Sequence, residues 1–123
     1  MNIIIDTHIF LWAVCEPEKL SSFKTDIVKT PTNTIFVSSI TFIEIMIKVS
    51  IGKLKIDFDP IETAKESGFE ILDFSAEDSL ALRDMPFHHK DPFDRMLISQ
   101  SINRDYYLMS DDGKFKNYDL KLI

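Results

Sequence analysis

The chain alternates short apolar runs of strand character with longer stretches of helical character. The strand-like runs are rich in β-branched and aromatic residues and lie at residues 1–6, 34–38, 69–74 and 106–109, with a last edge strand at 120–123. The helical stretches between them lie at residues 7–14, 20–29, 39–51, 59–65, 75–83 and 91–103. This order predicts an α/β fold, a three-layer α/β/α sandwich whose mostly parallel central sheet has about five short strands.

Length and composition limit the class of protein further. The 123 residues suit a single domain, 1–123, and a hydrophobic content of 45% is enough for a packed core. The longest apolar stretch is interrupted by Glu44 and Lys48, so no segment reaches the roughly 20 apolar residues of a membrane span. The first residues lack the basic region of a signal peptide, and the single cysteine, Cys15, fits a reducing compartment. We therefore expect a cytoplasmic protein with no membrane association.

Four acidic residues fall at or near the ends of strand-like runs or the starts of helices: Asp6, Glu44, Asp94 and Asp112. In a parallel sheet with helical crossovers, the carboxyl ends of strands and the amino ends of helices share one edge, where ligands bind. Clustered carboxylates repel one another and are costly to desolvate unless a cation neutralises them. The pattern therefore predicts a site for a hard divalent metal.

Each acidic residue also has a simpler structural explanation. Asp6 can cap a helix, and Glu44 precedes Lys48 by four residues, in the order that favours an ion pair on a helix surface. Asp91 and Asp94 flank Pro92 as the N-cap and third residue of a helix, and both would face its positive dipole end. A helix start and a metal site coincide at this edge, so one carboxylate can serve both roles.

The segment that follows the run at 106–109 leaves a similar choice open. Asp111 and Asp112 precede Gly113 and can form a turn and a cap, although adjacent like charges suggest that a cation attracts one of them. His8 and His89, like the remaining histidine, lack the spacing of a zinc site, so we interpret them as helix and loop residues.

Net charge constrains the partner. A net charge of −6 argues against a large basic surface for non-specific binding of nucleic acid. It does not exclude a nucleic-acid substrate, because much of the acidity would lie in the metal site, where bound cations reverse the local sign.

The chain resembles PIN-domain nucleases, specifically the VapC-like toxins of bacterial type II toxin–antitoxin pairs. The segments that carry the resemblance run in family order over essentially the whole chain: IIDTHIFLW at 4–12, VSSI at 37–40 leading to Glu44, HKDPFDRMLISQ at 89–100 and LMSDD at 108–112. The DPFDR-type segment followed by an apolar helix is quite specific, and the other three are weak singly. A family member often has Thr where this chain has Ser110.

The resemblance implies a PIN-like fold and an endoribonuclease that cleaves RNA phosphodiester bonds with Mg²⁺ or Mn²⁺. Oxygen ligands favour these two ions. The family's acidic quartet falls on Asp6, Glu44, Asp94 and Asp112, which are the implied catalytic residues and metal ligands. Asp91 is a further or substitute ligand beside Asp94, and Asp111 can replace Asp112.

The resemblance and the charge pattern also imply binding partners. The residues predicted to contact the RNA substrate are Arg95, Lys90, Ser110, Lys114 and Lys116. The stretch 40–51 is apolar nearly all round, so we expect a cognate antitoxin to bind it, and the family implies a homodimer. Two alternative functions stay open: a catalytically inactive PIN-like protein-binding module, and a nuclease that acts on structured DNA.

Overall fold

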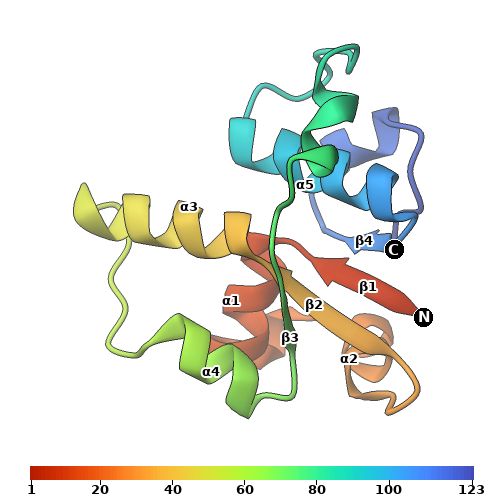
Figure 1. Cartoon of the computed structure of the whole chain (residues 1–123). Coiled ribbons are helices and arrows are strands. Elements are labelled where there is room, and N and C mark those ends of the chain that lie inside the picture. The colour runs from red at the N-terminus through yellow and green to blue at the C-terminus, as the bar shows by residue number, and fades with distance from the viewer.

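A parallel β-sheet lies at the centre of the computed structural model, which describes residues 1–123 (Figure 1). Its strands are β1 (Asn2–Ile5), β2 (Thr34–Ser38), β3 (Glu70–Leu72) and β4 (Tyr107–Met109), in the order β3-β2-β1-β4. Strand β1 pairs with both β2 and β4, so Ile3 lies beside Ile35 on one side and Tyr107 on the other. The run of three isoleucines suits this interior position, because a central strand is buried on both faces.

The sheet has four strands instead of about five. Residues 120–123 were predicted as an edge strand, and they do lie beside β4. Leu108 donates its backbone N–H to Lys121 at 2.8 Å, and Ile123 donates to Leu108 at 2.9 Å. The pairing amounts to one isolated parallel bridge between Leu108 and Leu122. The segment is therefore too short to continue the ladder as a regular strand.

The helices fall where the apolar periodicity predicts them, with small shifts at their ends. They are α1 (Thr7–Cys15), α2 (Ser22–Lys29), α3 (Ser39–Ser50), α4 (Pro60–Glu66) and α5 (Pro92–Arg104). Three short 3-10 helices are added, η1 (Pro17–Lys19), η2 (Glu77–Leu82) and η3 (Gly113–Asn117). The predicted helix at 75–83 is thus a 3-10 helix. No helix is long and apolar enough to cross a membrane.

Two apolar clusters, one on each face of the sheet, confirm the three-layer arrangement. Alternate residues of β1 point to opposite faces. Ile3 and Ile5 join the cluster that contains Phe10 of α1 and Ala64 of α4. Ile4 joins the cluster that contains Leu97 and Ile98 of α5 and Phe115 of η3, among others. Helix α3 contributes to both clusters, which places it across one end of the sheet (Figure 1).

Polar residues begin the helices at a common edge of the sheet. Asp6 accepts a hydrogen bond from the N–H of Ile9 at 2.9 Å and caps α1, while Ser38 accepts one from Ile40 at 3.1 Å and caps α3. Asp91 caps α5 and Asp112 caps η3 in the same way. These caps satisfy N–H groups that would otherwise lack partners. They also gather acidic side chains at one place.

Candidate metal centre

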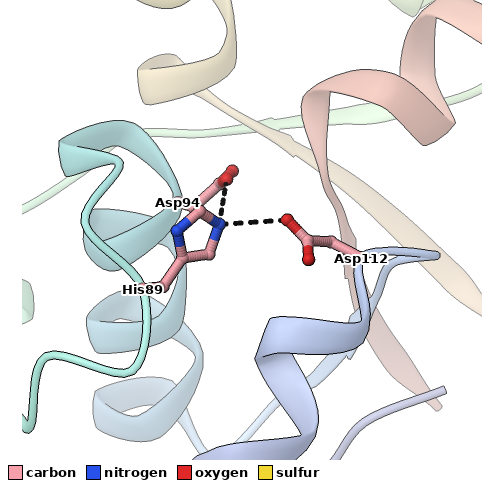
Figure 2. A group of neighbouring side chains, drawn as sticks. All are labelled: His89, Asp94 and Asp112. Carbon is pink, nitrogen blue, oxygen red and sulfur yellow. Dashed lines mark hydrogen bonds and ion pairs between the residues drawn. The ribbon is translucent and has the colours of Figure 1, made fainter.

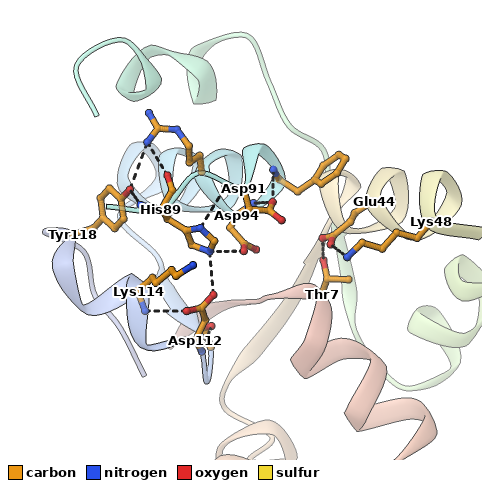
Figure 3. Close-up of polar contacts among 12 residues, drawn as sticks. Thr7, Glu44, Lys48, His89, Asp91, Asp94, Asp112, Lys114 and Tyr118 are labelled. Carbon is orange, nitrogen blue, oxygen red and sulfur yellow. Dashed lines mark hydrogen bonds and ion pairs between the residues drawn. The ribbon is translucent and has the colours of Figure 1, made fainter. Parts of the chain in front are cut away.

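The four predicted metal ligands come from four elements. Asp6 follows β1, Glu44 lies in α3, Asp94 lies in the first turn of α5, and Asp112 follows β4. Asp94 and Asp112 both contact His89, and Asp6 and Glu44 lie near enough for their charges to raise the pKa of Asp94; Glu44, Asp94 and Asp112 are visible in Figure 3. Asp6 and Glu44 are each only 3% exposed. Because these two carboxylates are almost fully buried, their negative charge is poorly solvated.

The ionisation of Asp94 reports how strongly these charges interact. Burial raises the pKa of Asp94, and the negative charges of Asp91, Asp6, Glu44 and Asp112 add to this effect, so that the pKa reaches about 8. Burial and neighbouring like charges both disfavour a carboxylate. The repulsion among these carboxylates is therefore not fully compensated, and a divalent cation would relieve it.

Asp6 combines the role of a helix cap with a place in the acidic group. Burial raises its pKa, and the hydroxyl of Ser110 and the N–H of Ile9 oppose the increase by donating hydrogen bonds. Its backbone N–H also continues the β1–β4 ladder by donating to Met109 at 3.1 Å. Asp6 is thus held at its backbone and at its carboxylate.

Glu44 is held by hydrogen bonds from both sides. Lys48 donates to Oε2 at 2.5 Å, which is the ion pair that the spacing predicts, and Thr7 donates to Oε1 at 2.7 Å (Figure 3). The hydroxyl of Thr7 also lies 3.1 Å from that of Thr41. The hydrogen bond from Lys48 to Glu44 raises the pKa of Lys48. Lys48 is the cation paired with Glu44, and no sequence pattern indicates that Thr7 binds Glu44.

Asp91 and Asp111, the alternative ligands that the sequence leaves open, differ from Asp94 and Asp112 in their hydrogen bonds and ion pairs. Asp91 uses Oδ1 to accept N–H groups from Phe93 at 2.9 Å and Asp94 at 3.1 Å, as a helix cap does. Asp111 forms an ion pair with Lys24 of α2, a residue that the sequence did not suggest, and Lys24 also donates to the carbonyl of Ser110 at 3.0 Å. Asp112 is therefore better placed than Asp111 to join Asp94.

A histidine joins the acidic group. The Nε2 atom of His89 lies 2.7 Å from Asp94 Oδ2 and 3.0 Å from Asp112 Oδ2 (Figure 2). Together the three residues offer ligand atoms that all lie within 4.8 Å of one another, a spacing that can hold a metal ion. From the sequence, His89 is interpreted only as a loop residue. The signal available in the sequence is its position two residues before the N-cap of α5, because the amino ends of the helices lie at the edge of the sheet where the site forms.

Comparison with known proteins identifies the family and the fold. The family model described as PIN domain matches residues 3–121. The chain belongs to the PIN domain family. A comparison of this PIN domain with curated proteins gave no match.

Solved structures share the fold of this PIN domain. VapBC2 from Rickettsia felis, bound to a DNA fragment from their promoter, is 23% identical with a TM-score of 0.70, covering 100% of this chain and 98% of that chain. DNA-bound VapBC from Salmonella typhimurium is 16% identical with a TM-score of 0.65, and the match covers 100% of this chain and 97% of that chain. VapBC-1 from nontypeable Haemophilus influenzae is 15% identical with a TM-score of 0.61, and the match covers 100% of this chain and 97% of that chain.

Arg95, which the sequence predicts to contact RNA, is occupied by contacts within the PIN domain. Arg95 is 8% exposed, and its guanidinium donates to the backbone carbonyls of Pro86 at 2.9 Å, Met85 at 3.2 Å and His89 at 3.3 Å. It also lies 4.0 Å from the centre of the Phe87 ring. These contacts use the planar donors of Arg95 to hold the loop that carries His89.

The other residues predicted to contact RNA differ in exposure. Ser110 is buried and accepts a hydrogen bond from the N–H of Asp112 at 3.0 Å, so it shapes the turn that carries Asp112. Lys90, Lys114 and Lys116 are exposed and form no ion pair. These three side chains are free to meet a ligand.

Proposed function

We propose that this PIN domain is a Mg²⁺- or Mn²⁺-dependent endoribonuclease and the toxin of a type II toxin–antitoxin pair. The observation that carries the proposal is the convergence of Asp6, Glu44, Asp94 and Asp112 on one group in which the pKa of Asp94 reaches about 8. Buried, mutually repelling carboxylates cost stability without a counter-charge, and such perturbed groups concentrate at functional sites.

The residues present fit a hard divalent cation. The four carboxylates that would hold it are those of Asp6, Glu44, Asp94 and Asp112, and Asp91 Oδ2 accepts no hydrogen bond and could join them. An all-oxygen carboxylate set favours Mg²⁺ or Mn²⁺ over softer metals. When bound, such an ion activates water and stabilises the leaving oxygen in phosphodiester hydrolysis.

The protein's own side chains orient the site and the substrate. The N–H of Ile9 holds Asp6, and the hydroxyl of Thr7 holds Glu44, so both carboxylates keep one geometry before any ligand arrives. Preorganised groups of this kind lose little energy to reorganisation during a reaction. Lys90, Lys114 and Lys116 bind the RNA backbone, because they are exposed cations near an otherwise acidic centre.

A cognate antitoxin is the proposed protein partner. Helix α3 leaves Ile43, Met46, Ile47 and neighbouring Ile51 between 43% and 59% exposed, which is unusual for large apolar side chains. The structures to which the chain is similar are described as VapBC complexes. We propose that the antitoxin lays a helix or strand on this face and brings a basic side chain to the carboxylates. We further propose a homodimer that acts in the cytoplasm.

Cleavage of RNA by charge-neutral variants tests the proposal. Asp6→Asn and Asp94→Asn should each remove Mg²⁺-dependent cleavage of single-stranded or transfer RNA, because an amide ligand carries no charge to hold the ion. Asp57→Asn, an exposed aspartate away from the group, is the matched control and should cleave like the parent. Equal cleavage by Asp94→Asn and the parent would refute the proposal. Cleavage of flapped DNA in preference to RNA would instead favour the structured-DNA alternative.

The antitoxin proposal has a separate test. Expression of the chain alone should arrest growth, and co-expression of the cognate antitoxin should restore it. A chain that is active on RNA in vitro and harmless in cells would refute the toxin role while leaving the nuclease role intact.

A further inference from the structure

The imidazole of His89 lies between two carboxylates of the metal centre. Its Nε2 atom is 2.7 Å from Asp94 Oδ2 and 3.0 Å from Asp112 Oδ2, and the residue is 6% exposed (Figure 2). Asp94 belongs to the first turn of α5 and Asp112 follows β4, so one ring atom contacts carboxylates from two different segments of the chain. Both contacts use Oδ2, and Oδ1 of Asp94 accepts no hydrogen bond.

The second ring nitrogen fixes which atom carries the proton. The backbone N–H of Asp91 donates to His89 Nδ1 at 3.3 Å, so Nδ1 is an acceptor. A neutral imidazole has one N–H, which must then be on Nε2. Nε2–H therefore donates to Asp112 Oδ2, and the same atom lies 2.7 Å from Asp94 Oδ2. Direct ligation of a cation by Nε2 would require the proton to move to Nδ1, where it would face the N–H of Asp91.

The backbone around His89 holds the ring in this position. The N–H of His89 donates to the hydroxyl of Tyr118 at 2.8 Å, and that hydroxyl donates to the carbonyl of Pro86 at 2.8 Å. The carbonyl of His89 accepts from Arg95 at 3.3 Å, and the ring packs against Phe115 with centroids 5.6 Å apart. The ring is thus supported from both sides, which a freely moving loop histidine would not be.

We propose that His89 is a positioning residue of the metal centre: its Nε2–H holds Asp112 by a hydrogen bond, its ring lies against Asp94, and both carboxylates are thereby oriented toward the ion without ligation by His89. The inference rests on the proposed function, because it concerns the same site. Partners that orient metal ligands set their direction and basicity, and their loss typically weakens metal binding about 10- to 100-fold.

Calorimetric titration of the full chain with Mn²⁺ tests this role. His89→Leu keeps a side chain of similar bulk and removes the donor, so it should weaken Mn²⁺ binding about 10- to 100-fold. His89→Gln retains an N–H at a similar distance from the backbone and should bind Mn²⁺ close to the parent. His88→Leu makes the same change at the exposed neighbouring histidine and should leave Mn²⁺ binding unchanged.

A measurement on the parent protein does not depend on whether the variants fold. Two-bond ¹H–¹⁵N spectra should show the His89 proton on Nε2, both without metal and with saturating Mg²⁺. A proton on Nδ1 in the Mg²⁺ state would overturn the proposal by indicating direct ligation. Mn²⁺ binding by His89→Leu that equals the parent, or binding by His89→Gln as weak as His89→Leu, would overturn it as well.

The outcomes separate this inference from the proposed function. A parent protein that binds Mn²⁺ and cleaves no RNA refutes the ribonuclease proposal, and the role of His89 is still decided by the Mn²⁺ affinities. A parent protein that binds no Mn²⁺ refutes both, because a metal centre is then absent.

Discussion

Replacement of Asp78 by asparagine should destabilise the fold at neutral pH and have little effect in acid. Asp78 is fully buried, and its carboxylate accepts hydrogen bonds from Arg104 Nε at 3.0 Å, Asn103 at 2.7 Å and the N–H of Ser75 at 2.8 Å. Ser75 in turn accepts from the N–H of Asp78, and the two reciprocal bonds form a capping box. These bonds attach η2 to α5, the helix that begins at the metal centre.

The size of the effect follows from the ionisation of Asp78. Burial alone would raise its pKa, but the hydrogen bonds from Arg104, Ser75 and Asn103 outweigh burial and lower the pKa from 3.8 to about 2. At about 1.4 kcal/mol for each pH unit, the charged carboxylate contributes roughly 2–3 kcal/mol to the free energy of unfolding. This contribution is present above the unfolded pKa near 4 and is lost as the pH falls through about 2.

Urea unfolding at several pH values measures the effect. The Asp78→Asn variant should lose roughly 2–3 kcal/mol of unfolding free energy at pH 7 and well under about 1 kcal/mol at pH 2, where the parent carboxylate is itself half protonated. Asp84→Asn is the matched control, because Asp84 pairs with Arg83 on the surface, where both side chains are at least 79% exposed. That control should show almost no change. An equal loss for Asp78→Asn at both pH values would refute the electrostatic reasoning.

Two further predictions concern the metal centre itself. Because the pKa of Asp94 is raised to about 8, the metal-free fold binds a proton that the unfolded chain releases. Its stability should therefore fall as the pH rises from about 4 to 8, and urea unfolding in EDTA should show a shallower slope for Asp94→Asn, in which Asp6 is the remaining carboxyl with a raised pKa. Thr7→Val removes the hydroxyl that donates to Glu44 and should lower unfolding free energy by about 1–3 kcal/mol. An unchanged urea midpoint for Thr7→Val would contradict the role of this hydrogen bond.

The sequence predicted the sheet and its helices because their signals are local. The isoleucines of β1, the capping residues Ser38 and Asp91, and the apolar periodicity of α5 each act within a few neighbouring residues. The edge strand at 120–123 was less predictable. Its apolar pattern is real, but the number of ladder bonds it forms depends on how closely it lies against β4.

The roles of charged side chains depended on tertiary contacts that no local pattern contains. Arg95 looked like an RNA contact because it follows Asp94, yet the fold directs it to the carbonyls of the loop before α5. His89 and Lys24 carried no signal of their own, and their partners at Asp112 and Asp111 lie in a distant segment. The acidic residues could be named in advance because strand ends converge in any parallel sheet.

The pairing of β4 beside β1 joins segments from distant parts of the sequence, and Asp6 and Asp112 become neighbours only through it. Such long-range contacts form late, since closing a long loop costs entropy before any contact compensates it. An incompletely folded or interrupted chain therefore holds only part of the acidic set. The full set of proposed metal ligands is therefore assembled only when β4 has paired with β1.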